Sequence, residues 1–217
     1  MATTQAELCN MALSHIGVAE QIVAITDDNA EANHCNLWFG EAQDKALAAF
    51  DWAFARRRIT LVVEAGTPPE PWTYQYQYPD NCIRPIRIDD KRTIRQSLDR
   101  IRFTTETNSS NARIIYTHMN AAVLIYTYRE TTYSLWPTWF VDYFTWQLAA
   151  RLAGPLLASE KAADRAERRM LMEKAKAISE ESESEQEDPE PDAPWIAARD
   201  SEFGDIPGVK SHDYWVP

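Results

Sequence analysis

The sequence predicts an α+β fold, in which an antiparallel helical bundle carries a small inserted antiparallel β domain and is followed by an extended acidic C-terminal tail. Apolar residues recur every three or four positions near both ends of residues 1–179 and alternate with polar residues in between. The composition then changes abruptly at Glu180. These observations divide the chain into a body, residues 1–179, and a tail, residues 180–217.

The acidity of the chain is concentrated in the tail. Residues 180–217 hold 12 of the 33 Asp and Glu residues but only 2 of the 22 Lys and Arg residues, so they carry −10 of the formal net charge of −11. The body is therefore almost neutral. A charge asymmetry of this kind is typical of a solvated or partner-binding tail.

Two helices are expected before the β domain, at about residues 4–16 and 28–54. Thr4 and Glu7 fit a capping box, in which the hydroxyl and the carboxylate each accept a backbone N–H. Gly17 occupies the position of a C-terminal cap. In the second helix, small and apolar residues recur every three or four positions, which suits close packing against other helices.

Two more helices are expected after the β domain, at about residues 137–153 and 159–180. Pro137 suits a first helical position, where its missing N–H would have no intrahelical partner. Aromatic residues occur almost all round the third helix, which predicts a core element rather than a cofactor site. Gly154 and Pro155 are expected to end that helix. The fourth helix is amphipathic, with one charged face.

The β domain is expected over about residues 57–128. Within it, residues 72–78 alternate aromatic and polar side chains, as a half-buried strand does. Strands are expected at residues 58–63, 72–78, 82–88, 93–95, 101–104, 113–117 and 122–128.

The tail contains large apolar residues, which are not expected in a segment that stays fully solvated. It begins mostly with Glu, Asp, Ser and Pro, a composition that cannot bury a core. We interpret the tail as a docking peptide for a partner protein, with an unstructured remnant as the alternative. The apolar anchors on this acidic background are Trp195, Ile196, Phe203, Tyr214 and Trp215.

Cys9, Cys35 and Cys82 are sparse and odd in number, which argues against a disulfide framework and predicts a reducing compartment. The nearby His15 and His34 do not complete a metal site, because zinc sites usually show a close ligand pair such as C-x-x-C. We expect core cysteines, no metal and no cofactor.

No residue pattern indicates catalysis. The sequence contains neither G-x-S-x-G nor a P-loop. Its many carboxylates offer pairs, but they carry no signature of glycoside hydrolysis. We therefore expect a protein that is not an enzyme and that has no catalytic residues.

The β domain is mildly basic, which leaves a nucleic-acid-binding module open as an alternative. A solvated sheet face, or a surface that meets an acidic neighbour, explains the same residues. The bases are Arg56, Arg57, Arg58, Arg84, Arg87, Lys91, Arg92, Arg95, Arg100, Arg102 and Arg113.

Four short motifs follow one another before a Trp- and Phe-rich helix and a charged helix. They are Ala12-Leu13-Ser14-His15-Ile16-Gly17, Phe50-Asp51-Trp52-Ala53-Phe54-Ala55, Tyr76-Gln77-Tyr78-Pro79-Asp80-Asn81-Cys82-Ile83-Arg84 and Leu124-Ile125-Tyr126-Thr127-Tyr128-Arg129. Over about residues 4–180, their order and spacing resemble the head-to-tail adaptor family of tailed bacteriophages, called tail tubular protein A in short-tailed phages. The tail lies outside this resemblance.

The resemblance implies a structural virion protein of the neck, synthesised in the host cytoplasm and assembled as a homo-oligomeric ring, commonly of twelve copies. Such a ring joins the portal protein to the nozzle or tail tube and lines part of the DNA exit channel, without sequence-specific DNA binding and without a membrane. In this family C-terminal segments reach the portal, so the tail anchors are expected to make that contact. A tail-associated cell-wall hydrolase is an alternative. Candidates for tail-side or subunit contacts are Arg84, Arg87, Arg92 and Arg95.

Overall fold

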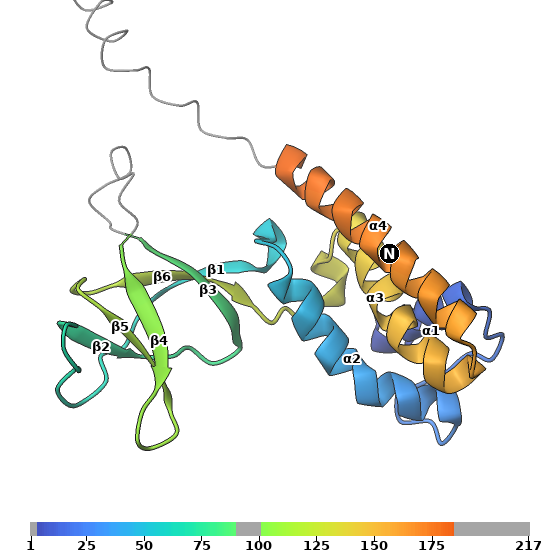
Figure 1. Cartoon of the computed structure of the whole chain (residues 1–217), viewed down its shortest axis with the longest axis horizontal. Coiled ribbons are helices and arrows are strands. Elements are labelled where there is room, and N and C mark those ends of the chain that lie inside the picture. Colours follow the sequence, from blue (N-terminus) through green and yellow to red (C-terminus); the bar gives the residue numbers. More distant parts are fainter. Residues whose placement is uncertain (1–3, 90–100, 185–217) are drawn as a thin grey trace, which may run out of the picture. The chain divides into compact units, whose positions relative to one another are not determined.

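The structure, a computed structural model, describes residues 4–89 and 101–184. By their contacts, Met1–Glu185 form one unit and Gln186–Pro217 another, and the elements below all belong to the first unit. Within the described residues, four α-helices and two small antiparallel sheets give a mixed α+β fold, which confirms the predicted class (Figure 1). None of the described helices is both long and apolar enough to cross a membrane.

The first helix has the predicted caps. In α1 (Gln5–Ile16), the Thr4 hydroxyl accepts the Glu7 N–H at 3.2 Å, and the Glu7 carboxylate accepts the Thr4 N–H at 3.1 Å. Gly17 ends the helix with a φ of 84°, a conformation that residues with a side chain rarely adopt. Both caps are made by neighbours in sequence, so the sequence alone indicates them.

The second helix is shorter than predicted. α2 (Ala30–Ala48) ends well before residue 54, and the chain then forms the short 3-10 helix η1 (Ala53–Ala55). The Trp52 indole is fully buried and donates from Nε1 to the Ala46 carbonyl at 2.9 Å, in the last turn of α2. The apolar spacing continues past the end of α2 because the following residues pack on the same core without being helical.

Six strands form two three-stranded antiparallel sheets, with the orders β1-β6-β3 and β2-β5-β4. Each overlaps a predicted strand, and the strand predicted at residues 93–95 lies outside the described residues. The strands are β1 (Arg56–Thr60), β2 (Tyr74–Gln77), β3 (Cys82–Asp89), β4 (Phe103–Thr107), β5 (Arg113–Thr117) and β6 (Val123–Tyr128).

The segment that follows β1 connects the two sheets. β1 pairs with β6 along its whole length. Shortly after, the Gln77 N–H donates to the Val62 carbonyl at 2.9 Å and the Glu64 N–H donates to the Gln75 carbonyl at 3.0 Å, so the same segment also pairs with β2. A small core serves both sheets, made of Leu61, Tyr76, Cys82, Ile88, Ile115, Ala122, Leu124 and Tyr126.

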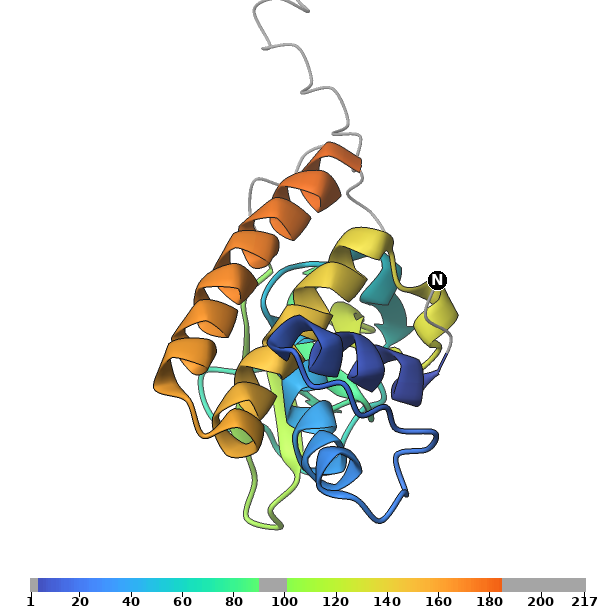
Figure 2. The ribbon, with the colours of Figure 1, turned by 90° about the vertical axis from the view of Figure 1, so that its right-hand side faces the viewer.

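The third helix contacts all the others. α3 (Thr138–Leu157) packs against α1, α2 and α4. Its contact with α4 (Glu160–Ser184) is the most extensive, and the two helices lie side by side in both views (Figures 1 and 2). Trp136, Phe140, Tyr143 and Phe144 are all buried, which confirms the interpretation of this aromatic run as core.

The predicted end of α3 at Gly154 and Pro155 is wrong, because the helix continues to Leu157. Pro155 stands in the last turn, where its missing N–H costs a single hydrogen bond. Ala158, with a φ of 46°, closes the turn by donating its N–H to the Gly154 carbonyl at 3.0 Å. At the other end, Pro137 is the N-cap rather than the first helical residue.

The fourth helix runs past the predicted start of the tail at residue 180, since α4 ends at Ser184. Ala166 and Ala177 are its buried apolar residues. Glu181 lies four residues after Ala177, on the same face of the helix, and is buried as well. The first residues of the predicted tail therefore belong to the helix.

Candidate functional site

Of the predicted contact residues, the structure describes Arg84 and Arg87, both on β3, an edge strand of its sheet. Arg87 is exposed. Arg84 is partly buried, and its Nε has no hydrogen-bond partner among the described residues. The predicted residues outside the described part are Arg92, Arg95, Trp195, Ile196, Phe203, Tyr214 and Trp215.

The basic character of the β region is partly neutralised by ion pairs. Arg57 also lies over the Tyr128 ring, with its guanidinium carbon 3.6 Å from the ring centre. Two of the three acidic partners are distant in sequence from their arginines, and Asp51 is five residues before Arg56, so composition alone did not reveal the pairs. The pairs are Arg56–Asp51, Arg57–Glu130 and Arg58–Asp89, with N–O distances of 3.0, 3.0 and 3.5 Å.

The stretch between β2 and β3, which carries the third motif of the resemblance, lines a hollow of about 580 Å³. The Tyr78 hydroxyl donates to the Cys82 carbonyl at 3.3 Å, and the Arg113 guanidinium lies 3.8 Å from the Tyr78 ring centre. Burial raises the pKa of Tyr78 and of the Cys82 thiol, so both stay protonated at neutral pH. The hollow thus has both signs of charge, with the cations Arg113 and Arg129 and the carboxylates Glu64 and Asp80, and Arg129 is paired with Asp44.

The buried residue Glu130 joins α2 and β1 to the segment after β6. Glu130 is only 5% exposed. Its side chain accepts from Arg57 Nη2 at 3.0 Å and from the Thr132 N–H at 2.9 Å. Its backbone carbonyl accepts from Nε2 of Gln43, on α2, at 2.9 Å. The helices and the β region are fastened to each other at this point.

We expect Glu130→Gln to lower the free energy of unfolding at pH 7 by about 1.5–3 kcal/mol, the range for hydrogen bonds to a charged group. Burial works to raise the pKa of Glu130, but hydrogen bonds from Thr132 and Arg57 outweigh it and lower the pKa below its usual value. A lowered pKa stabilises the fold above the pKa of the unfolded chain. That contribution is lost as the pH falls through the folded-state pKa.

Urea denaturation at several pH values measures this effect. The difference between wild type and Glu130→Gln is expected to shrink in acid, where both side chains are uncharged. Glu106→Gln, at an exposed position on β4, is the matched control and should change little. A difference that stays constant down to acid pH would contradict the assignment.

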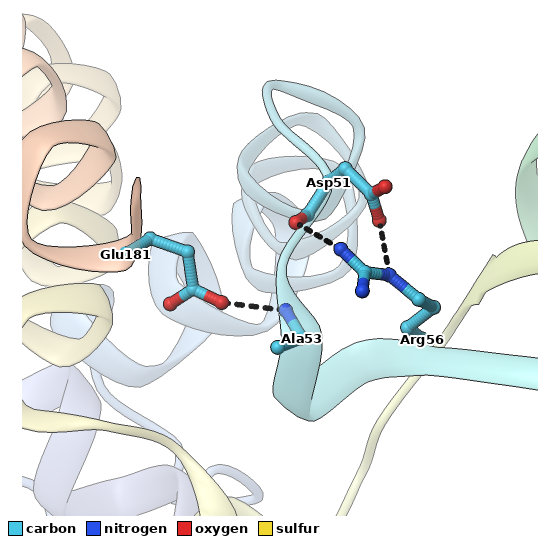
Figure 3. A network of polar contacts seen from close by, with 4 residues as sticks. All are labelled: Asp51, Ala53, Arg56 and Glu181. Carbon is cyan, nitrogen blue, oxygen red and sulfur yellow. Dashed lines mark hydrogen bonds and ion pairs between the residues drawn. The ribbon is translucent and has the colours of Figure 1, made fainter. Parts of the chain in front are cut away.

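A second buried carboxylate holds the end of α4 against η1 (Figure 3). Glu181 Oε1 accepts the Ala53 N–H at 2.5 Å, and Oε2 accepts from Trp139 Nε1 at 3.0 Å. Beside it, Arg56 donates from Nε to Asp51 Oδ1 at 3.0 Å. Glu181 was expected in the tail, so this role was not predicted, although its spacing of four from Ala177 indicates the buried face of the helix.

A groove of about 630 Å³ runs along α4, and we call it the basic groove. The His15 ring stacks on Trp146 with ring centres 4.2 Å apart, and its Nε2 lies 3.2 Å from Thr145 Oγ1. Burial lowers the pKa of His15, so its imidazole is neutral at neutral pH. The positive charge of the groove therefore comes from α4. Its lining is His15, Trp146, Lys161, Asp164, Arg165, Arg168, Arg169 and Met172.

All three cysteines are buried free thiols, as expected of core residues. The Cys9 thiol donates to Cys35 and is shielded from water, and both effects raise its pKa. Across residues 4–89 and 101–184, no three His, Cys, Asp or Glu side chains are grouped so that they could hold a metal ion.

Comparison of the sequence with protein-family models gave no match, and comparison with curated proteins gave none either. The function proposed below therefore depends on the order of the motifs, on the fold and on the surfaces just described.

Proposed function

We propose that the chain is a head-to-tail adaptor of a tailed bacteriophage, a structural virion protein that forms a ring between the portal and the nozzle or tail tube and lines the DNA exit channel. The order of elements supports this, with two helices before the β region and two after it. The four motifs fall at the end of α1, at η1, between β2 and β3, and on β6. The proposal includes an antiparallel bundle arrangement of the four helices.

An exposed apolar stretch next to an open sheet edge carries the proposal. Ile59, Val62 and Val63 are 40%, 59% and 64% exposed. Within its sheet, β1 pairs with β6 alone, so among the described strands its other edge has no partner as far as Thr60. Val62 and Val63 follow that edge, in the segment whose backbone pairs with β2. An open edge with apolar side chains is a liability in a monomer. A neighbouring subunit in a ring covers such a surface.

In this proposal the tail docks on the portal. An acidic segment that orders on binding loses part of its interaction energy to conformational entropy, so each tail binds weakly. Several tails on one ring offset this cost, because each additional tail binds at high effective concentration. Such weak, multiplied contacts suit a subunit that joins a filled head and remains unassembled beforehand.

Deleting residues 188–217 is expected to weaken capture by portal rings of the cognate phage at least about tenfold, which corresponds to about 1.4 kcal/mol. The deletion leaves α4 complete. A full-length control with the five tail anchors changed to Ser keeps the acidity and should lose the same affinity. The mass of the purified chain, alone and mixed with portal rings, measures both assembly and capture. Undiminished capture by the truncated chain would contradict tail docking.

A further inference from the structure

We propose that neighbouring copies of this chain contact each other through two different surfaces of their helical part. The connection between α1 and α2 of one copy binds in the basic groove of the next copy. This inference rests on the proposed function, because it names a subunit contact of the proposed ring. It concerns a surface separate from the exposed stretch near β1.

The basic groove has four cations, and none of them forms an ion pair with a described residue. Lys161, Arg165, Arg168 and Arg169 are all exposed, and within the described residues none of them forms a salt bridge. Their spacing of four, three and one places them on one side of α4. Among the residues that line the groove, Asp164 is the one carboxylate, and Asp142 and Glu173 lie near enough to act on His15. The four cations outnumber these three carboxylates. The net charge of the groove therefore favours an acidic partner.

The groove also has an apolar rim. Met172 lines it and is 62% exposed, and the adjacent Leu171 is 56% exposed. At its floor, Arg169 lies over the Trp146 ring, 5.8 Å from the ring centre. A partner for this groove should combine negative charge with a small apolar side chain.

The connection between α1 and α2 has these properties. Residues 17–29 include Glu20, Asp27 and Asp28 and contain no Lys or Arg. Val23, in the middle, is 90% exposed, the highest value among the large apolar residues found exposed in the described chain. Glu20 and Asp28 are exposed on either side of it. The connection therefore presents an apolar tip with carboxylates around it.

The tip is held rigidly by its own hydrogen bonds. The Asn10 side chain, on α1, binds both the N–H and the carbonyl of the buried Ile22, each at 2.9 Å. The Asp27 carboxylate accepts the N–H groups of Val23 at 2.8 Å and of Ala24 at 3.0 Å. Pre-organisation of this kind lowers the entropy lost on binding.

The outer part of the α1–α2 connection lies apart from α4, although the two surfaces begin close together, since His15 lines the groove and the connection starts at Gly17. In Figure 2, α4 is on one side of the helices and the outer part of the α1–α2 connection, in blue, is on the other. Two different, complementary surfaces on separate sides form a heterologous contact, which builds closed rings when the rotation between copies closes. The opposite charges also orient the copies before contact.

Cross-linking of single-cysteine variants tests the contact. Full-length Val23→Cys and Met172→Cys chains are mixed, alone and on portal rings, and treated with a short thiol-specific cross-linker. The buried native thiols do not compete. We expect mixed dimers at least about tenfold above those from Leu37→Cys with Met172→Cys. Leu37 is also an exposed apolar residue, at 67% against 90% for Val23. The yield should fall at high salt, which screens exposed charges.

A second experiment exchanges the charges on the two surfaces. Arg165→Glu with Arg168→Glu in the Met172→Cys chain should lower the cross-linking about tenfold, since like charges then face each other. Glu20→Arg with Asp28→Arg in the Val23→Cys chain should restore most of it. Melting curves of each variant confirm that it is folded.

The outcomes separate the inference from the proposed function. Assembled rings without the 23–172 link overturn this contact and leave the adaptor proposal standing. Chains that neither self-associate nor join portal rings overturn the adaptor proposal and the contact with it. Loss of the link on adding single-stranded DNA or a peptide of residues 185–217, with rings still intact, assigns the groove to that ligand and overturns the contact between copies.

Discussion

Replacing Trp52 by alanine is expected to lower the free energy of unfolding by about 3–5 kcal/mol, the usual cost of truncating a buried large aromatic side chain. Trp52 is fully buried between α2 and η1. Its ring packs edge-on against Phe50 and Phe140, with ring centres 5.4 and 5.1 Å apart. The change also removes the indole donor of the Ala46 carbonyl. A cavity therefore adds to the lost apolar burial, and the Ala46 carbonyl keeps only the Ala49 N–H, at 3.3 Å.

Urea denaturation followed by far-UV circular dichroism measures this loss. Trp72→Ala is the matched control, because Trp72 is only partly buried and its ring packs on His118, with ring centres 5.0 Å apart. We expect the control to cost about 1 kcal/mol, near the average for single substitutions. Similar losses for both variants would show that Trp52 does not anchor the end of α2.

Glu181→Ala is expected to lower the free energy of unfolding by about 1.5–3 kcal/mol, since it leaves a backbone N–H and an indole N–H without their charged acceptor. The contact fastens α4 to η1 and α3, as Figure 3 shows for its η1 half. Glu183→Ala removes an equal charge two residues on, at an exposed position, and should change the stability by about 0.5 kcal/mol or less.

A double-mutant cycle with Trp139→Phe isolates one half of this contact. The phenyl ring keeps most of the apolar surface but cannot donate to Glu181. The two substitutions together should cost less than the sum of their separate effects, because each removes the same hydrogen bond. Additive losses, or a loss for Glu183→Ala as large as for Glu181→Ala, would refute the fastening role.

Local signals explain which parts of the fold the sequence predicts. The capping box of Thr4 and Glu7 involves residues three apart, and the pattern of residues 113–117 coincides with β5. The predicted end of α2 was wrong because apolar spacing indicates which residues face the core and not whether the backbone there is helical. The end of α3 was wrong because a proline in a last turn costs little.

The candidate sites depend on contacts between distant residues, which composition does not reveal. Glu130 binds Arg57 across 73 positions, and Glu181 binds Ala53 across 128. From the sequence, Glu130 was not singled out and Glu181 was expected in the tail. The cations of α4 were visible as a charged face, but their grouping with Trp146 and His15 follows from the packing of α1 and α3 against α4. The tail anchors remain a prediction from the sequence.

The pairing of β1 with β6 also sets how the chain can diversify. The chain leaves the helical part at Arg56 and comes back to it at Thr127, which is the direct partner of Arg56 in the antiparallel ladder. Paired residues of this kind have Cα atoms about 5 Å apart. We expect that a module whose ends meet at that spacing, and that keeps the contacts of β3 and β6 with α2, can replace the residues in between. One scaffold can thus carry different β modules, each suited to a different neighbour.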